Sequence, residues 1–96
     1  MRFEWDENKR RTNIKRHGFD FVDMQEIFEN GTCSFPDDRF DYGEVRYFTL
    51  GLLFGRIVAV SHTETDEISR IISVRKANKH EQERYFSEIA NRLGEN

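Results

Sequence analysis

The spacing of hydrophobic residues divides the chain into a helical first third, a strand-rich middle and a final helix. Residues 7–17 are mostly polar, and Asp6 before them and Gly18 after them are residue types typical of the two ends of a helix. Residues 21–30 place hydrophobic side chains at helical spacing, which predicts a second helix that packs on a core. Residues 2–5 predict a short strand ahead of both helices.

From residue 32 onward the hydrophobic positions follow the shorter period of β-strands. Residues 32–35 predict one short strand, and residues 45–54 and 56–64 predict a hairpin that turns near Gly55. Residues 68–74 predict a third consecutive strand after the hairpin.

The last helix is predicted from Asn78 and Glu81, which have the spacing of a capping box. One of its faces is hydrophobic and carries Tyr85, Phe86, Ile89, Ala90 and Leu93. Helices that stand apart from a run of strands indicate one α+β domain over residues 1–96, with an antiparallel β-meander sheet, two N-terminal helices and one C-terminal helix. We expect the helices to cover one face of the sheet and to leave the other partly open.

Composition narrows the class of protein. The 96 residues are 36% hydrophobic and 34% charged, which fits one folded domain. No apolar stretch approaches the ~20 residues of a membrane span, and the N-terminus lacks an apolar signal region, so we expect a cytoplasmic protein. Cys33 is the only cysteine, and the three histidines are scattered, so we expect neither an intrachain disulfide nor a metal or other cofactor.

Charge is unevenly distributed along the chain. The net charge is −3, yet residues 18–45 hold eight acidic residues and one basic residue. One explanation is ordinary solvated surface charge. The other is a basic surface for an anion together with an acidic surface for a basic partner, to which Asp37, Asp38 and Asp41 would contribute.

His62 and Glu64 are the first candidates for chemistry. In a regular strand they project from the same face, at the strand's end. A carboxylate beside a histidine can orient the ring for proton transfer. A histidine that is hydrogen-bonded at the rim of a sheet would give the same pattern, and both interpretations stay open.

A cluster of cations surrounds the junction between the third strand and the last helix. Arg70, Arg75 and Lys76 could hold phosphate there, because arginine offers a fork of donors and the start of a helix favours anions. Strand alternation sends Arg70 and Arg75 to opposite faces, so both can serve one site only if the strand ends near Val74. Tyr85 could contact the same substrate or could belong to the core.

His17 ends the first helix, next to Lys15 and Arg16. The two cations could grip a phosphate chain and His17 could transfer a proton. A cation at a helix C-terminus is also favoured by the helix dipole, which would be a purely structural role. If the substrate is RNA, cleavage without a metal needs a base, an acid and cations for the charged intermediate, and these side-chain types can supply all three.

Three segments resemble the BrnT family of type II toxins: "FEWDENKRRTNIKRHGFDF", "GRIVAVSHTE" and "RIISVRKANKHEQERY". The resemblance covers nearly the whole chain. It implies a RelE-like α+β fold and a bacterial endoribonuclease that inhibits translation. It also implies neutralisation by a DNA-binding BrnA antitoxin, whose complex with the toxin represses their own operon.

The chain departs from the family pattern at three positions. Arg16 stands where Lys is frequent, Thr65 stands where Arg is frequent, and Val74 replaces the usual Ala. If an Arg at position 65 helps to bind phosphate, this chain has one cation fewer. Two alternatives to an active ribonuclease therefore stay open: a weakened or inactive module that binds the antitoxin, and a domain that binds RNA without cleaving it.

Overall fold

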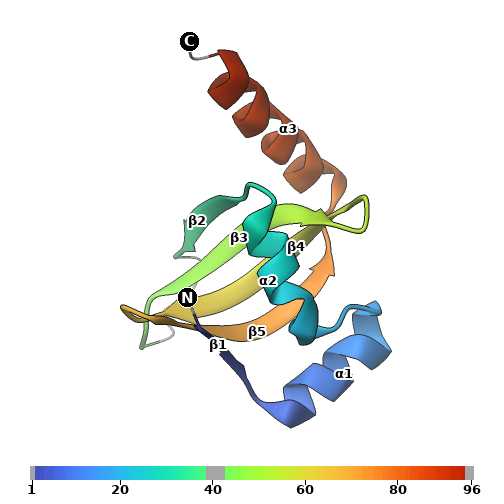
Figure 1. Cartoon of the computed structure of the whole chain (residues 1–96), viewed down its shortest axis with the longest axis vertical. Helices are drawn as coiled ribbons and strands as arrows, with labels where there is room; N and C mark the ends of the chain where they lie inside the picture. The colour runs from blue at the N-terminus through green and yellow to red at the C-terminus, as the bar shows by residue number, and fades with distance from the viewer. Residues whose placement is uncertain (1, 39–42, 95–96) are drawn as a thin grey trace.

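The computed structural model describes residues 2–38 and 43–94, which form five strands, three α-helices and one short 3-10 helix. Asp41, one of the acids expected to face a partner, lies outside the described residues. In chain order the elements are β1 (Arg2–Trp5), α1 (Glu7–His17), the 3-10 helix (Phe21–Asp23), α2 (Met24–Glu29), β2 (Cys33–Asp37), β3 (Arg46–Leu53), β4 (Arg56–Glu64), β5 (Ile68–Lys76) and α3 (Lys79–Gly94). Figure 1 shows α1 below the sheet, near β5, and α3 extending upward and away from the sheet.

Helix α1 has the bounds that its end residues predict. The Asp6 carboxylate accepts a hydrogen bond from the Lys9 backbone N–H at 3.0 Å. Gly18 adopts a left-handed conformation, with φ of 78°, and its N–H donates to the Ile14 carbonyl. The local chemistry of the two caps therefore sets the length of the helix.

The second predicted helix is split into the 3-10 turn and α2. Asp20 begins it by accepting from the Val22 N–H at 3.1 Å. The same carboxylate accepts two hydrogen bonds from the Arg10 guanidinium, at 2.8 and 2.9 Å. These bonds hold the pKa of Asp20 below its ordinary value and tie α1 to the start of the next segment.

The sheet has the strand order β1-β5-β4-β3-β2. Strands β2 to β5 form the predicted antiparallel meander. The expectation of a wholly antiparallel sheet is wrong for β1, which pairs with β5 in parallel, so the sheet is mixed. β1 precedes both N-terminal helices and joins the edge of the sheet from the far end of the sequence, without a hairpin to set its direction.

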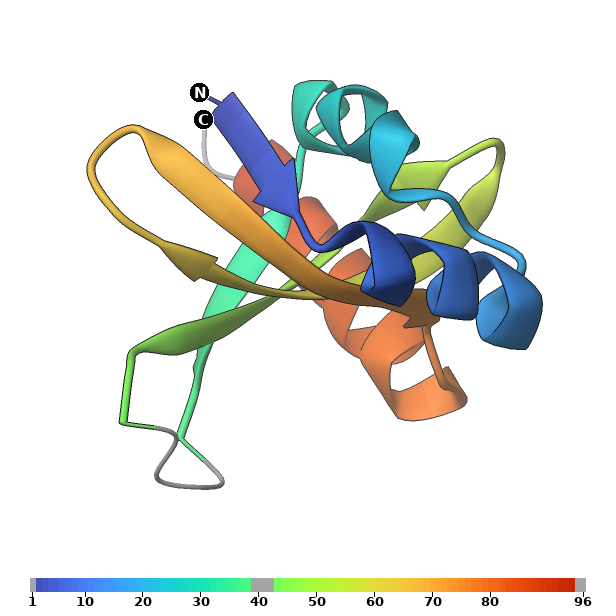
Figure 2. The same cartoon turned by 90° about the horizontal axis from the view of Figure 1, so that it is seen from below.

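Helices pack on both faces of the sheet, which corrects the expectation that they share one face (Figure 2). The α2 face carries the larger core, made of Phe19, Phe21, Met24, Ile27, Leu53, Val58, Val60, Ile71 and Val74. The α3 face carries a second core, made of Cys33, Leu50, Ile57, Ala59, Ala77 and Tyr85. Because α3 extends beyond the sheet, it covers only part of its face.

Strand β5 contains a β-bulge at Ile72. Ser73 pairs with Ser61 of β4, and Ile71 pairs with the next residue, His62, so Ile72 has no partner of its own. An extra residue in one strand reverses the alternation of all side chains beyond it. Ile71 and Val74 therefore both reach the α2 face, although their spacing predicts opposite faces.

The bulge brings Arg70 and Arg75 to the same face of the sheet. Arg70 pairs with Thr63 and Arg75 with Ala59, both on the α3 face. The prediction that this requires the strand to end near Val74 is wrong, because β5 continues to Lys76. The bulge, and not an early end of the strand, places Arg70 and Arg75 on the same face.

Helix α1 covers the edge of β5 beyond the short strand β1. The Asn13 amide donates to the Val74 carbonyl at 2.9 Å, and the Val74 N–H donates back to the Asn13 side-chain oxygen at 3.0 Å. The amide also donates to the Phe19 carbonyl at 2.9 Å. Asn13 thus replaces a neighbouring strand, and an otherwise unpaired edge is satisfied. No helix among the described residues is long and apolar enough to cross a membrane.

Candidate functional site

A hollow of about 460 Å³ lies between the first turns of α3 and the part of the sheet that α3 leaves uncovered. Its floor comes from β2, β3, β4 and β5, and its wall comes from α3. The lining residues are Phe35, Pro36, Asp37, Asp38, Phe48, Ser61, Arg75, Asn78, His80, Glu81 and Arg84. We call this the α3 hollow.

Arg75 is held by the residue that also caps α3. Its guanidinium donates to both Glu81 oxygens, at 2.7 and 2.8 Å. Glu81 accepts in addition from the Asn78 N–H at 2.9 Å, and the Asn78 side chain accepts from the Glu81 N–H at 2.8 Å. The capping box that the sequence predicts is therefore present, and it fixes the planar Arg75 group at the start of the helix.

Arg84 stands one turn further along α3. Its guanidinium carbon lies 3.6 Å from the centre of the Phe35 ring, and Phe35 stacks on Phe48 with 5.1 Å between ring centres. Cation–π contact of this kind orients an arginine without a carboxylate. Arg84 forms no ion pair with a described residue, so no described carboxylate occupies its guanidinium.

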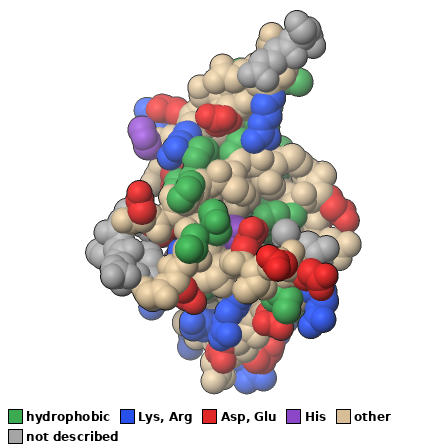
Figure 3. Space-filling model, turned by 90° about the vertical axis from the view of Figure 1, so that its left-hand side faces the viewer, with side chains coloured by type: hydrophobic (Ala, Val, Ile, Leu, Met, Phe, Trp, Pro, Cys, Tyr) green, Lys and Arg blue, Asp and Glu red, His purple; other side chains and the backbone are tan. Residues whose placement is uncertain are grey.

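His80 supplies an exposed imidazole to the same hollow. It lies four residues before Arg84, so the two side chains share one face of the helix. Asp37 and Ser61 contribute a carboxylate and a hydroxyl from the sheet. In the space-filling view of Figure 3, acidic, basic and hydrophobic side chains lie next to one another, so the charges of the sequence are not segregated on this side of the molecule.

His62 points to the opposite face of the sheet and is fully buried. Its ring nitrogens lie 2.6 Å from the Thr49 hydroxyl and 3.2 Å from the Ser69 hydroxyl, and Glu64 approaches to 3.5 Å. Phe28 packs edge-on against the ring. Burial lowers the pKa of His62 to about 4, so the ring is neutral near pH 7 and has no path to an external substrate.

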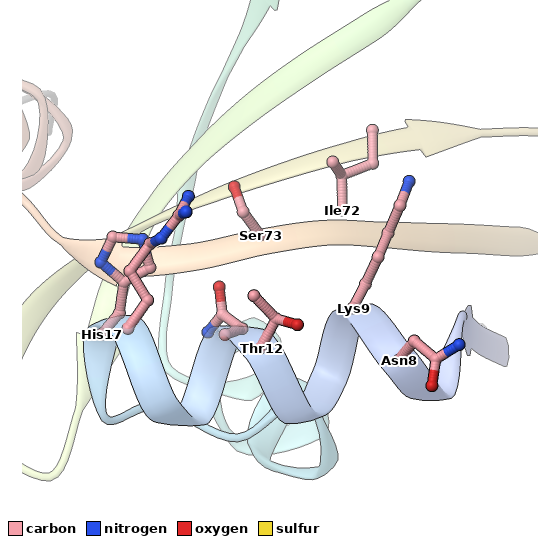
Figure 4. Close-up of a pocket in the computed structure, with 8 residues that line it drawn as sticks. Asn8, Lys9, Thr12, His17, Ile72 and Ser73 are labelled. Carbon is pink, nitrogen blue, oxygen red and sulfur yellow. The ribbon is translucent and has the colours of Figure 1, made fainter.

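A second hollow, of about 310 Å³, lies between α1 and β5 (Figure 4). It brings together Arg16 and His17, two of the predicted site residues, with Lys9 and Ser73. In Figure 4 the Lys9 side chain reaches from α1 across β5, and the Ser73 side chain projects from β5. We call this the α1 hollow.

The structure distributes the other predicted residues over separate places. Arg70 lies beside β1, in a shallow depression with Trp5. Lys76 lies near the β3–β4 turn, and Lys15 is exposed on α1 without lining either hollow. Tyr85 is buried in the α3-face core, donates to the Gly31 carbonyl at 3.3 Å, and has its pKa raised by burial.

His80 and Arg84 line the α3 hollow but are absent from the site residues that the sequence predicts. A signal for them exists, because a capping box fixes the first turn and an i, i+4 pair then shares one face. The floor residues Phe35 and Phe48 gave no such signal, since their pairing across β2 and β3 depends on the register of strands that are distant in sequence.

The fold and the two hollows define a small α+β protein with exposed arginine, lysine and histidine side chains arranged around an open sheet face, which suits an anionic ligand. Within the described ranges, no group of three or more His, Cys, Asp or Glu residues is placed to hold a metal ion. The family model described as the ribonuclease toxin BrnT of type II toxin-antitoxin systems matches residues 5–81, and the chain belongs to this family. No curated protein matches the chain.

Proposed function

We propose that this ribonuclease toxin is an endoribonuclease that cleaves RNA without a metal ion, and that the α3 hollow is its cleavage site. The observation that carries the proposal is the convergence of Arg75, Arg84 and His80 in one hollow. The two arginines come from different elements and are each fixed by a different contact. Ordered guanidinium groups and an imidazole are the groups that phosphodiester cleavage requires.

The reaction we propose uses the 2′-hydroxyl of the RNA as the nucleophile. Its oxygen attacks the adjacent phosphorus, the bond to the 5′-oxygen breaks, and a proton moves from the first oxygen to the second through groups of the protein. Arg84 would stabilise the charged intermediate, since its fork of donors matches phosphate oxygens. Arg75 donates through both terminal nitrogens to Glu81 and would add a positive charge held at a fixed position. His80 would transfer the proton, because it is the exposed imidazole in the hollow.

The Phe35 and Phe48 rings support a role for the α3 hollow in nucleotide binding. Both rings line the hollow and both are partly buried, so their positions are fixed before a ligand arrives. Aromatic faces next to cations suit the bases and the backbone of single-stranded RNA together.

Thr65 does not remove a cation from the α3 hollow. It lies after the end of β4, where its N–H donates to the Ile68 carbonyl at 2.9 Å. Ser61 is the β4 residue that lines the hollow, and four residues of strand separate the two positions by about 13 Å. The substitution of the usual Arg at position 65 therefore favours neither the inactive module nor the RNA-binding domain.

The test is cleavage of RNA by the purified protein in EDTA. We expect cleavage, with products that end in a 2′,3′-cyclic phosphate. His80→Gln should lower kcat by roughly 100-fold or more, as loss of a general acid or base does. Arg84→Gln should lower kcat/KM, whereas Arg11→Gln, which removes an equal charge from the exposed side of α1, should have little effect. Binding of RNA without cleavage would contradict the ribonuclease activity and support the alternative of an RNA-binding domain.

We further propose that cleavage occurs in the cytoplasm and inhibits translation, and that a BrnA-like DNA-binding antitoxin neutralises it and brings the complex to operator DNA. Membership of a type II toxin family supports a protein antitoxin. We also propose that the fold is RelE-like, which the β2–β5 meander followed by α3 supports. Expression of the chain alone should arrest growth and degrade RNA, and co-expression with the adjacent reading frame should restore both. Equal growth in the two cultures would contradict the proposal that the chain is a toxin neutralised by this partner.

A further inference from the structure

The α1 hollow differs from the α3 hollow in its charge. Its lining residues are Asn8, Lys9, Thr12, Asn13, Arg16, His17, Ile72 and Ser73, and no acid lines it among the described residues. The α3 hollow, in contrast, contains three carboxylates. The α1 hollow therefore offers cations, hydroxyls and amides to a phosphate group without a competing carboxylate in its lining, whereas phosphate binding in the α3 hollow relies on Arg84, which has no ion pair with a described residue.

The basic residues of α1 differ in whether they pair with a carboxylate and whether they line the hollow. Arg10 is paired with Asp20 and Glu7, and Arg11 approaches Glu7 at 3.9 Å, so these two stabilise the fold or the helix surface. Lys9 and Arg16 line the α1 hollow, and neither pairs with a carboxylate in the described part of the chain.

Lys9 and Arg16 therefore lie on the face of α1 that borders β5, whereas Lys15, which also has no ion pair with a described residue, is exposed outside the hollow. Lys9 and Arg16 are seven residues apart, which is two helical turns, and they flank the middle of the hollow.

A pair of serines joins the two hollows. Ser73 lines the α1 hollow, Ser61 lines the α3 hollow, and the two are direct partners across β5 and β4. Direct partners on adjacent strands project from the same face of the sheet, so both hydroxyls lie on the α3 face. Arg75 follows Ser73 by two residues, a distance of about 6.6 Å along the strand. Figure 2 shows α1 and the first turns of α3 on either side of the end of β5.

We propose that the α1 hollow is a second phosphate-binding site, which holds the backbone of single-stranded RNA next to the scissile phosphate. The RNA would cross β5 over the two serines, with one phosphate between Lys9 and Arg16 and the next bound by Arg75 and Arg84. The inference rests on the proposed function, because it names how the substrate of the α3 hollow extends beyond it. The site contributes to affinity and to substrate length, not to the chemical step.

The experiment compares two double variants of the full chain that remove the same charge from the same helix. Lys9→Ala/Arg16→Ala removes the cations of the α1 hollow, and Arg11→Ala/Lys15→Ala removes two cations outside it. Binding of a single-stranded RNA oligonucleotide is measured by fluorescence anisotropy over a range of salt concentrations, and cleavage is measured with the oligonucleotide and with a dinucleotide.

We expect the first variant to bind the oligonucleotide more weakly, by about fivefold for each lost phosphate contact at 0.1 M salt, and to lose about 0.7 per contact from the slope of log affinity against log salt. Its kcat on the oligonucleotide and its cleavage of the dinucleotide should equal those of the unmodified protein. The control variant should keep most of the affinity. Circular dichroism of both variants shows whether α1 is intact.

Three other results would contradict either the second site or the proposed function. Equal affinities for the two double variants would overturn the second site while leaving cleavage in the α3 hollow untouched. Equal losses on the dinucleotide and the oligonucleotide would place the α1 hollow at the cleavage site itself and overturn the proposal in this form. An unmodified protein that binds RNA through Lys9 and Arg16 without cutting it would sustain the phosphate site and refute the ribonuclease function.

Discussion

Replacing His62 by Gln should remove a large part of the loss of stability that the protein shows on mild acidification. His62 is fully buried and its pKa is lowered to about 4, whereas an unfolded chain has a histidine pKa near 6.5. Between these two values the unfolded state binds a proton that the native state does not bind. The free energy of unfolding must therefore decrease as the pH falls through this window.

The expected size of the effect follows from the two pKa values. The full difference corresponds to roughly 3 kcal/mol, and the part that develops between pH 7 and pH 5 is about 2 kcal/mol. This is a large fraction of the 5–15 kcal/mol that stabilises a typical domain. Glutamine can still bond to the hydroxyls of Thr49 and Ser69, but it does not titrate.

The assay is urea unfolding at a series of pH values, followed by circular dichroism. His62→Gln is compared with the unmodified protein and with His80→Gln, which removes an exposed histidine. The other titratable groups are the same in the unmodified protein and in His62→Gln. A difference between these two proteins in the slope of unfolding free energy against pH therefore arises from His62. A slope for His62→Gln as steep as that of the unmodified protein would show that the buried ring is not held neutral. An imidazole NMR resonance of His62 that titrates near pH 6.5 would show the same.

Three further predictions test the packing that positions the hollows. Asn13→Ala should lower the free energy of unfolding by about 2–4 kcal/mol, since it leaves buried backbone groups of the β5 edge without partners; urea unfolding measures this. Gly51→Ala should cost about 1–3 kcal/mol, because the added Cβ would lie 2.8 Å from Ile27, and thermal unfolding should show it against a Gly94→Ala control, where an added Cβ meets nothing within 4 Å. Asp20→Asn should flatten the loss of stability below pH 4, because Arg10 holds the Asp20 pKa low and that stability disappears as the carboxylate protonates; acid titration by fluorescence checks it.

The parts of the structure that short-range chemistry controls could be predicted from the sequence. The bounds of α1 follow from Asp6 and Gly18, each of which bonds within its own helical turn. The capping box of Asn78 and Glu81 is present for the same reason. The hairpin of β3 and β4 follows from the hydrophobic alternation of its strands and the turn at Gly55.

The parts that depend on distant pairing could not be predicted. The bulge at Ile72 is a feature of how β5 pairs with β4, which the sequence of β5 alone does not show. It reverses the face on which Arg75 lies relative to Arg70, compared with a regular strand. The burial of His62 depends on α2, whose Phe28 packs against the ring. The alternation of residues along a strand therefore predicts the face on which a side chain lies only as far as the first bulge.

The segments that carry the family resemblance contain many residues that build the fold. Asn13 closes the edge of β5, His62 lies in a hydrogen-bonded core, and Tyr85 anchors α3. Residues with such long-range contacts tolerate little change, so a motif that contains them identifies the architecture better than the chemistry.

Glu81 joins architecture and chemistry, because one carboxylate caps α3 and orients Arg75. The start of the helix and the position of Arg75, which we propose to lie at the cleavage site, therefore depend on the same carboxylate. Arg84 lies beyond the residues that the family model matches, and its place in the site rests on its contact with Phe35. The assignment of the α3 hollow consequently depends on the geometry of the first turns of α3 and not on the motifs alone.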